Sequence, residues 1–346
     1  MRHKIKHPML STPFTPFAPQ ISDLSFPADY SLFKQGITQS LLSTWQRCSI
    51  AFLISLNRWI DPNKGKRTGF GSLFHQMLDN LYTYYARTGK TPKSKLIKRW
   101  IEEYAEREEE KKGRSTLSGK EEEEIERDKL VTLILLEEYI NFYPKDFKKK
   151  KFDEIEKSFE VKFHGYVLRG KIDARYWLSD ERWLMEHKTK SRFNWPELIL
   201  KLSFDLQNLF YILADEIENN HKVQGVLYNV VRNPGDAWRK KYTSIYDYGR
   251  VLRAKIKKNP EHYFLRKEII YSEEDKRNFR KNLLNKLRAI NKLLKGETPL
   301  YPNESSCLTQ YTCDNLRACS AGCLIGYEQK PVLMNELEQE TEKVSV

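Results

Sequence analysis

The sequence GKIDARYWLSDERWLMEHK, residues 170–188, decides the fold of this chain. Residues 167–177 and 183–188 are rich in β-branched and aromatic side chains, and the Ser-Asp-Glu at 179–181 between them is typical of a turn. The pattern therefore predicts two short strands joined as a β-hairpin. Unusually for a buried hairpin, it also carries charged residues in its interior.

The charged residues of this hairpin fall at related positions. Because strand side chains alternate between faces, Glu186 and Lys188 project from one face while His187 points to the other. Asp173 on the preceding strand meets them across the ladder. Carboxylates are hard oxygen ligands for Mg²⁺ or Mn²⁺, and a neighbouring lysine orients or deprotonates a metal-bound water or neutralises charge on a phosphate. The group indicates metal-assisted phosphodiester hydrolysis, and a solvated charged face is the alternative interpretation.

Two further segments carry polar residues that suit the same chemistry. Asn194 and Pro196 begin a helix, and Gln207 and Tyr211, four residues apart within it, share one face. Upstream, a second helix turns His75 inward from an apolar face. Core packing is the alternative explanation for His75 and explains much of Tyr211, whereas it explains Gln207 less well.

In this order the residues resemble the RecB-like branch of the PD-(D/E)xK nuclease superfamily, with similarity to the CRISPR-associated RecB-like iron–sulfur exonucleases and to the AddB nuclease domain. The resemblance covers about residues 38–324. The proline that often precedes the motif aspartate is Ile172 here. The matching residues are Gly71-x-x-x-His75, Gly170-x-x-Asp173, Glu186-x-Lys188 and Gln207-x-x-x-Tyr211, followed by a group of cysteines.

The resemblance implies a fold and a set of site residues. The fold is an α/β, restriction-endonuclease-like core with a central mixed β-sheet flanked by helices. An acid on the strand before the hairpin sometimes supports the site, which makes Glu160 a candidate. Lys188 would be the catalytic lysine, and Gln207 and Tyr211 would steady it and the scissile phosphate. The implied metal ligands are His75, Asp173, Glu186 and the main-chain carbonyl of His187.

The five cysteines suggest a second metal centre. An odd number in a chain without a secretory signal argues against a disulfide scaffold, and four thiolates fit either tetrahedral Zn²⁺ or a [4Fe-4S] cluster. The resemblance implies a structural [4Fe-4S] cluster with one cysteine before the histidine helix and three near the end. We assign Cys48, Cys307, Cys313 and Cys319, with Cys323 as the alternative ligand. A zinc site formed by the last four cysteines stays open.

Composition supports a polyanionic partner. The 346 residues carry a net charge of +13, with a pI near 9.3, which favours nucleic acid over an anionic membrane. Residues 102–128 contain twelve acids and six bases, which leaves +19 on the remainder. No apolar run approaches the roughly 20 residues that cross a membrane. We expect a cytoplasmic protein of a bacterial, archaeal or phage-infected cell.

We therefore predict a metal-dependent DNA exonuclease that acts on ends or single strands in recombination, repair or replication. A structure-specific endonuclease and an inactive nucleic-acid-binding subunit of a helicase–nuclease complex are the alternatives, and a helicase or recombinase partner is open. Basic and aromatic residues after position 236, among them Trp238, Tyr242, Tyr246 and Tyr248, suit a single-strand groove or an ordinary surface.

The chain divides into seven predicted segments. Phe14, Phe17 and Phe26 would anchor the first, and one helix is expected over residues 38–60. The charged insertion would project from the core with a flexible tip. The segments are an irregular arm (1–36), helices with the first cysteine and the histidine (37–90), the charged helical insertion (91–150), the nuclease core (151–235), a basic helical region (236–300), the cysteine segment (301–326) and a disordered acidic tail (327–346).

Overall fold

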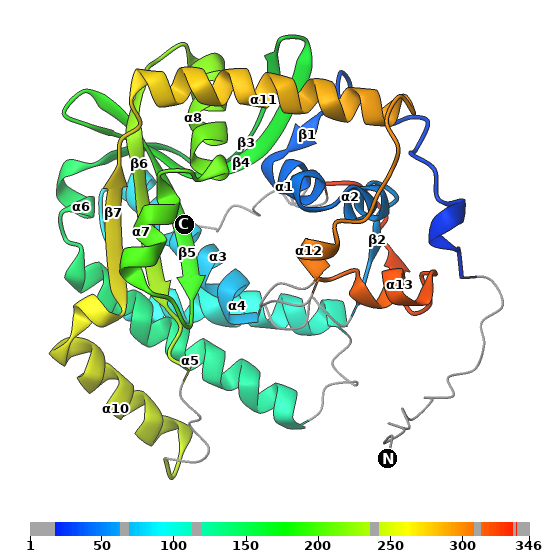
Figure 1. Ribbon diagram of the computed structural model, residues 1–346. Coiled ribbons are helices and arrows are strands. Elements are labelled where there is room, and N and C mark those ends of the chain that lie inside the picture. Colours follow the sequence, from blue (N-terminus) through cyan, green and yellow to red (C-terminus); the bar gives the residue numbers. More distant parts are fainter. Residues whose placement is uncertain are drawn as a thin grey trace, which may run out of the picture.

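A six-stranded mixed β-sheet flanked by helices forms the centre of the molecule, which confirms the predicted fold class (Figure 1). The computed structural model describes residues 18–62, 69–112, 119–235, 242–307, 313–334 and 337. Among these residues, no helix is long and apolar enough to cross a membrane. The sheet consists of β1 (Ile37–Thr38), β3 (Lys151–Phe163), β4 (Tyr166–Leu178), β5 (Glu181–Lys190), β6 (Val223–Arg232) and β7 (Phe264–Ile269).

The predicted hairpin is β4–β5, and its register sets up the site. The strands are antiparallel, and Ser179 and Asp180 between them both have positive φ, as a two-residue hairpin turn requires. Ala174 pairs with Met185, so Asp173 and Glu186 are neighbours across the ladder. The predicted strand beside the hairpin is β6, which runs parallel to β5, while β3 pairs antiparallel with β4. The strand order is β1-β4-β5-β6-β7, and β3 joins the sheet off this path through β4.

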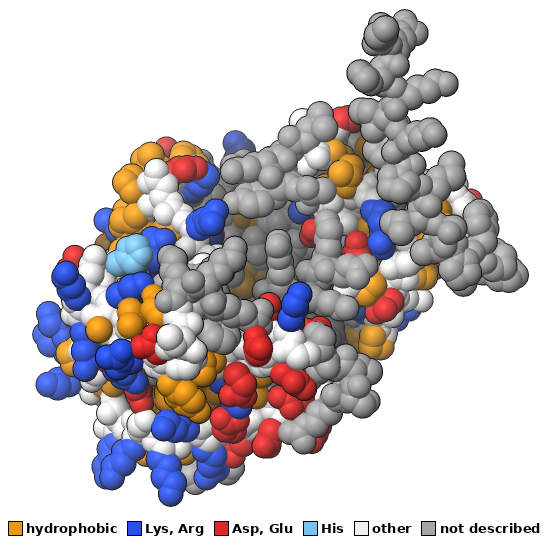
Figure 2. Space-filling view, turned by 90° about the horizontal axis from the view of Figure 1, so that it is seen from below, with side chains coloured by type: hydrophobic (Ala, Val, Ile, Leu, Met, Phe, Trp, Pro, Cys, Tyr) orange, Lys and Arg blue, Asp and Glu red, His pale blue; other side chains and the backbone are white. Residues whose placement is uncertain are grey.

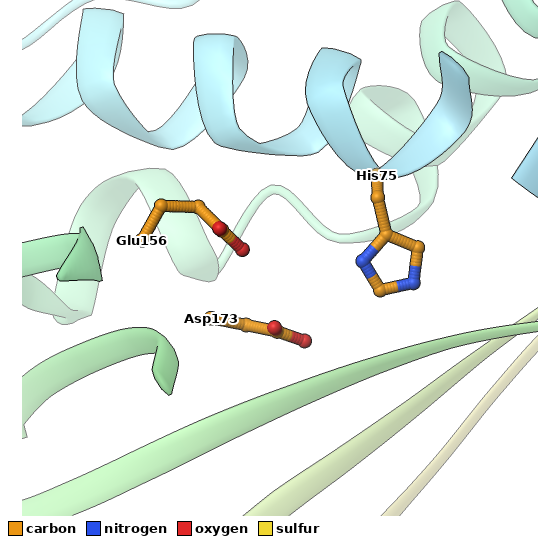
Figure 3. Close-up of side chains that lie close together, drawn as sticks. All are labelled: His75, Glu156 and Asp173. Atoms are coloured by element: carbon orange, nitrogen blue, oxygen red, sulfur yellow. The ribbon is translucent and has the colours of Figure 1, made fainter. Parts of the chain in front are cut away.

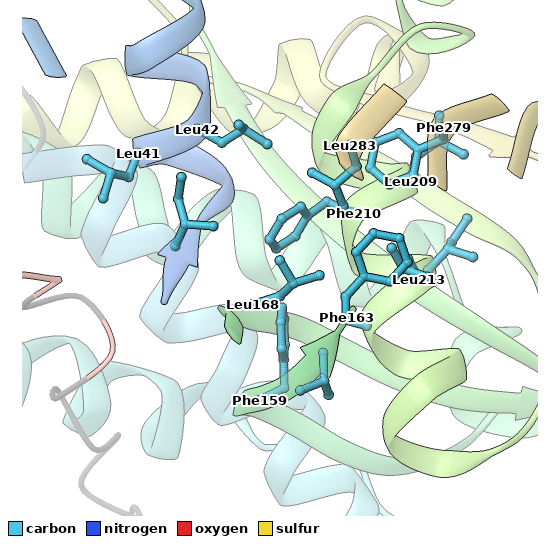
Figure 4. Packing of buried hydrophobic residues seen from close by; sticks show 14 of the residues in the cluster. Leu41, Leu42, Phe159, Phe163, Leu168, Leu209, Phe210, Leu213, Phe279 and Leu283 are labelled. Carbon is cyan, nitrogen blue, oxygen red and sulfur yellow. The ribbon is translucent and has the colours of Figure 1, made fainter. Parts of the chain in front are cut away.

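One face of the sheet packs against α1 (Gln39–Arg47), α8 (Leu206–Asn219) and α11 (Glu273–Leu294). Leu168 of β4, Phe210 of α8 and Leu287 of α11 are fully buried in this cluster. Figure 4 shows Phe210 among the side chains of the strands and neighbouring helices. Packing of α8 on this face holds the helix that carries Gln207 against the hairpin.

The opposite face packs against α3 (Gly69–Thr88), α4 (Ser94–Lys112), α5 (Gly119–Phe142) and α10 (Ile245–Lys258). Trp100 of α4 and Leu135 of α5 are buried in this cluster. The expected insertion thus packs on the core through the apolar side chains of α4 and of the C-terminal half of α5, which is a correction for that part of residues 91–150. The charged residues 120–124 of α5 are exposed, as expected of the projecting part. The predicted flexible tip falls on residues 113–118, outside the described residues.

Two predicted helices are each divided in two. The helix expected over 38–60 is α1 followed by α2 (Ser49–Leu56), because Cys48 between them is extended, with φ of −167°. The helix expected from Asn194 is α7 (Trp195–Leu202) followed by α8. Asp205 caps α8 by accepting a hydrogen bond from the backbone N–H of Asn208. Gln207 therefore lies in the first turn of its helix and not in the interior.

The start of the predicted tail belongs to the fold. β8 (Glu328–Gln329) pairs antiparallel with β2 (Trp59–Ile60), so the disorder expected from residue 327 does not hold for these residues. Phe26 of the arm packs on the core as expected, while Phe14 and Phe17 lie outside the described residues. The remaining elements are 3-10 turns at Ile21–Asp23 and Pro260–His262 and the helices α6 (Asp146–Lys149), α12 (Glu304–Cys307) and α13 (Leu316–Ala321).

Charge is unevenly distributed over the surface. Figure 2 shows Lys and Arg side chains along one side of the face seen from below and a patch of Asp and Glu beside them. Glu102, Glu103 and Glu126 of α4 and α5 are about half exposed or more. The acids of this segment are thus solvated, which leaves the positive charge to the rest of the chain.

Candidate active site

Three predicted residues meet at the hairpin. The Asp173 carboxylate accepts a hydrogen bond of 2.6 Å from the backbone N–H of His187, which fixes β4 to β5 beside the site. Glu186 is 3% exposed and forms an ion pair with Lys188. The second oxygen of Glu186, Oε2, is buried without a hydrogen-bond partner. A buried carboxylate oxygen of this kind needs a cation or another donor.

A cluster of possible metal ligands lies beside the hairpin. Ligand atoms of His75, Glu156 and Asp173 all lie within 4.8 Å of one another. His75 comes from α3, and Figure 3 shows its ring and the two carboxylates directed toward a common space. Among the described residues, no other group of three or more His, Cys, Asp or Glu residues satisfies this distance. One nitrogen and two oxygen donors suit a divalent cation.

Sequence reasoning missed Glu156 and named Glu160 instead. Glu160 is 57% exposed and pairs with Arg169 at 2.6 Å, away from the ligand cluster. Glu156 has φ of 51°, in the left-handed region that a non-glycine residue rarely adopts, at a cost of about 1–3 kcal/mol. The unusual backbone thus occurs where this carboxylate meets His75 and Asp173.

Further charges surround the ligand cluster. Lys171 pairs with Glu156 at 2.7 Å. Asp79, one turn after His75 on α3, is 7% exposed, and burial together with the charges of Glu156 and Asp173 raises its pKa well above the ordinary value. The site is therefore rich in buried carboxyl groups, an arrangement that added positive charge would stabilise.

The electrostatics of the metal-ligand candidates follow from burial and crowding. Burial, the charge of Glu186 and the charge of Glu156 raise the pKa of Asp173 well above its ordinary value. Burial likewise raises the pKa of Glu186, although Lys188 opposes the shift. Burial and the charge of Lys188 lower the pKa of His75 to about 4, so its imidazole is neutral at pH 7 and keeps a lone pair for a cation.

Lys188 is held as a cation. Burial opposes its charged form, but attraction to Glu186 and Asp173 outweighs burial and raises its pKa above the ordinary value. The ammonium donates hydrogen bonds to Glu186 and, at 3.0 Å, to Oε1 of Gln207. The amide nitrogen of Gln207 donates to Glu186 at 2.9 Å and to the Tyr211 hydroxyl at 3.2 Å. The structure thus brings Gln207 and Tyr211 together with the charged pair of the hairpin.

The motif glycine before Asp173 makes room for this helix. A Cβ atom added at Gly170 would lie 2.6 Å from Cζ of Phe159 and 3.2 Å from the Tyr211 ring. Gly170 therefore permits the close approach of α8 to the hairpin. Packing accounts for the position of the Tyr211 ring, while its hydroxyl remains in the network of Gln207.

A buried network lies behind the hairpin and orients His187. The His187 ring stacks on Tyr82 with centroids 5.5 Å apart, and its Nδ1 lies 2.9 Å from Nδ2 of Asn229. Oδ1 of Asn229 accepts a 2.8 Å hydrogen bond from Arg266, whose guanidinium also pairs with Asp146 at 2.6 Å. The side chain of His187 is thus fixed on the side away from Lys188, as strand alternation predicted.

The cysteines form a looser group. All five are free, and Cys48 lies at the junction of α1 and α2. Burial and the charges of Cys48, Cys313 and Cys307 raise the pKa of Cys319 to about 11. Among the described residues, which include all five cysteines, no three sulfur atoms lie within 4.8 Å of one another. Cys323 forms an isolated β-bridge with Gln20 at the edge of this region.

The predicted basic and aromatic groove is divided by the fold. Tyr246 is 80% exposed, whereas Tyr248 is 1% exposed and belongs to the core. Tyr242 is partly buried and its ring contacts that of Tyr248 at a tilt, with centroids 5.1 Å apart, so packing explains both rings. Trp238 lies outside the described residues.

Comparison with models of known protein families gives a match over most of the chain. The sequence profile described as the PD-(D/E)XK nuclease superfamily matches residues 37–320, which span the whole sheet and α1 through most of α13. A search of curated proteins finds no match.

Proposed function

The chain belongs to the PD-(D/E)XK nuclease superfamily, and from this premise we propose that it is a metal-dependent DNA exonuclease of the RecB-like branch. The observation that carries the proposal is the cluster of His75, Glu156 and Asp173, with the Glu186–Lys188 ion pair beside Asp173 on the hairpin. Nuclease activity is what the family suggests, and the strongly basic chain supports a nucleic acid as substrate. The choice of DNA rests on the resemblance to the RecB-like nucleases.

The residues at this site fit a divalent cation. His75, Glu156 and Asp173 offer three ligand atoms within 4.8 Å, and Glu186 adds a buried oxygen that lacks a partner. We assign these four side chains, together with the main-chain carbonyl of His187, to Mg²⁺ or Mn²⁺. When bound, such a cation supplies an activated water nucleophile and neutralises charge on the phosphate.

The remaining residues position the substrate. Lys188 is charged and is held between Glu186 and Gln207, so it donates a hydrogen bond to a phosphate oxygen and balances charge there. Gln207 restrains the lysine and the Glu186 carboxylate at the same time. Tyr211 orients the Gln207 amide through its hydroxyl. In this proposal Lys188 acts as a fixed cation and not as a base.

The mode of cleavage rests on resemblance. A histidine in place of another carboxylate at the helix position accompanies exonuclease behaviour in the RecB-like relatives, and His75 occupies that position here. We propose recombination, repair or replication as the setting, with single strands or free ends as the substrate. A structure-specific endonuclease, or an inactive subunit of a helicase–nuclease complex, would be recognised by the assay below.

We also propose a structural [4Fe-4S] cluster held by Cys48, Cys307, Cys313 and Cys319. Cys48 and Cys313 are among the charges that raise the pKa values of Cys307 and Cys319, and Cys323 is not, which supports the choice over Cys323. The cluster would tie α2 to the C-terminal segment.

Replacement of one proposed ligand tests the cluster. In Cys48→Ser purified without oxygen, we expect lost iron and a lower melting temperature, with Cys323→Ser as the matched control. Unchanged iron content in Cys48→Ser would refute the assignment. If Cys48→Ser retains iron but Cys323→Ser loses it, Cys323 and not Cys48 is the fourth ligand of the cluster.

Digestion of end-labelled DNA tests the function. Protein purified without oxygen is incubated with linear or circular single-stranded DNA and Mn²⁺, beside Glu186→Ala, Lys188→Ala and the exposed control Glu160→Ala. We expect wild type and Glu160→Ala to degrade linear DNA, both site variants to spare it, and circles to survive. Cleavage of circles would make the protein an endonuclease. DNA binding without cleavage by wild type would favour the inactive binding subunit.

A further inference from the structure

A pocket lies between the junction of α1 and α2, the C-terminal part of α11 and the loop that follows α11. Figure 1 shows these three segments beside one another. It encloses about 580 Å³, within the roughly 300–1,000 Å³ of ligand-binding pockets. Of the residues assigned above, only Cys48 lines it. The pocket is therefore distinct from the ligand cluster at the hairpin.

The lining of this pocket is positively charged without compensation. Arg47, Lys286 and Lys292 line it, and its other lining residues include no Asp or Glu. In the part of the chain that the structure describes, none of these three cations is within ion-pair distance of a carboxylate. Burial lowers the pKa of Lys286, as expected for a half-buried ammonium without a counterion. A polyanion would supply the missing charge.

The same pocket offers aromatic surface. Trp45 and Tyr301 line it, and Tyr301 is 66% exposed. Its walls are joined by hydrogen bonds: the Ser49 hydroxyl donates to the carbonyl of Tyr301 at 2.6 Å and accepts from its N–H at 3.0 Å. The amide of Asn303 donates to the carbonyl of Arg47 at 2.8 Å. The backbone at Arg47 and the backbone at Tyr301 are thus joined across the pocket before any ligand binds.

We propose that this pocket binds a segment of single-stranded nucleic acid. Arg47, Lys286 and Lys292 contact phosphates, and Tyr301 with Trp45 stacks on an unpaired base. A duplex keeps its base faces stacked inside the helix, so only a single strand offers both partners. The inference rests on the proposed nuclease function, for which the pocket would guide the strand beyond the point of cleavage.

Binding in EDTA tests the pocket without cleavage. Fluorescence anisotropy measures the affinity of the full chain for a labelled single-stranded oligothymidine. Wild type is compared with a double variant, the pocket variant, that carries both Lys286→Ala and Lys292→Ala. The control replaces Lys95 and Lys98, two exposed lysines of α4, and so removes the same charge elsewhere. We expect at least tenfold weaker binding for the pocket variant and less than threefold for the control. The slope of log K against log salt should flatten by about 1.4 in the pocket variant, since each lost phosphate contact accounts for about 0.7.

A stacking variant separates the rings from the charges. Tyr301→Ala should weaken binding about fivefold or more, because stacking of one base is worth at least about 1 kcal/mol. Phe33→Ala, which removes a 47% exposed ring outside the pocket, is its control. Because Tyr301 and Lys292 are exposed, variants at these two positions keep the core intact, and their melting temperatures are measured alongside.

The outcomes distinguish the source of the phosphate and the two proposals. If the pocket variant loses the same affinity for oligonucleotides with and without a 5′-phosphate, the pocket binds internal phosphodiesters. If it loses affinity only for the 5′-phosphorylated strand, the pocket binds a strand end. Equal affinities of the pocket and control variants, or equal losses for duplex and single strand, overturn the pocket proposal. If wild type does not cleave DNA with Mn²⁺ but the pocket variants lose affinity, the nuclease proposal fails and the pocket stands.

Discussion

The helix that carries Gln207 is fastened to the hairpin by a buried ion-pair network, and replacing its central carboxylate should destabilise the fold measurably. Asp215 of α8 is fully buried and accepts hydrogen bonds of 2.6 Å from Arg175 and 2.7 Å from Arg182, which lie on β4 and β5. Arg175 also pairs with Glu154, and Arg182 with Asp153. The network thereby joins α8 to both strands of the hairpin.

The magnitude follows from burial and from the partners that remain. Asp215→Asn keeps the shape but places a neutral amide between two buried guanidinium groups, and breaking a buried pair costs about 3–5 kcal/mol. Since both arginines keep other carboxylates, we expect the lower end, about 3 kcal/mol. Glu218→Gln is the matched control, because Glu218 is 24% exposed and makes a single 2.9 Å contact with Arg175. Loss of this contact in Glu218→Gln should lower the free energy of unfolding by about 1 kcal/mol.

Urea unfolding in EDTA, followed by circular dichroism, measures both variants against wild type. A lower midpoint at unchanged slope reports lost stability without a change in the surface exposed on unfolding. The reasoning is refuted if Asp215→Asn and Glu218→Gln cost the same within about 0.5 kcal/mol, or if Asp215→Asn is the more stable variant.

Three other predictions concern the site. Gly170→Ala should lower the free energy of unfolding, measured in urea, by about 1–3 kcal/mol, because the new Cβ would overlap Phe159. Gly119→Ala is the control and should be tolerated, because no atom lies within 4 Å of a Cβ placed there. Glu156→Gln should weaken Mn²⁺ binding in calorimetry at least about tenfold, an outcome that Glu160→Gln should not share. The folded-state pKa of His75, about 4, lies below its unfolded value of 6.5, so the stability that neutral His75 contributes is present above pH 6.5 and is lost as pH falls toward 4. In EDTA, the free energy of unfolding of wild type should fall by about 3 kcal/mol more than that of His75→Gln between pH 6.5 and pH 4. If the two proteins lose stability in parallel over this range, the lowered pKa of His75 is contradicted.

The hairpin could be predicted because its signals are local. Strand alternation puts Glu186 and Lys188 on one face, and a two-residue turn fixes the register that brings Asp173 opposite Glu186. The helix break at Cys48 has no such signal, since neither proline nor glycine is near it in the sequence. Contacts from residues about 250 positions away hold this junction, through the hydrogen bonds of Ser49 with Tyr301 and of Asn303 with Arg47. Propensity alone could not anticipate them.

Glu156 is the instructive case, because its position follows from a turn that the sequence contains. His164 and Gly165 both have positive φ and join β3 to β4, so that Phe163 pairs with Tyr166. Counting back from that turn in antiparallel register places Glu156 opposite Asp173. The sequence therefore held enough information for the register, although a resemblance between motifs drew attention to Glu160. The left-handed backbone of Glu156 could not be predicted from the sequence, because a non-glycine residue keeps such a conformation only where the surrounding folded structure holds it.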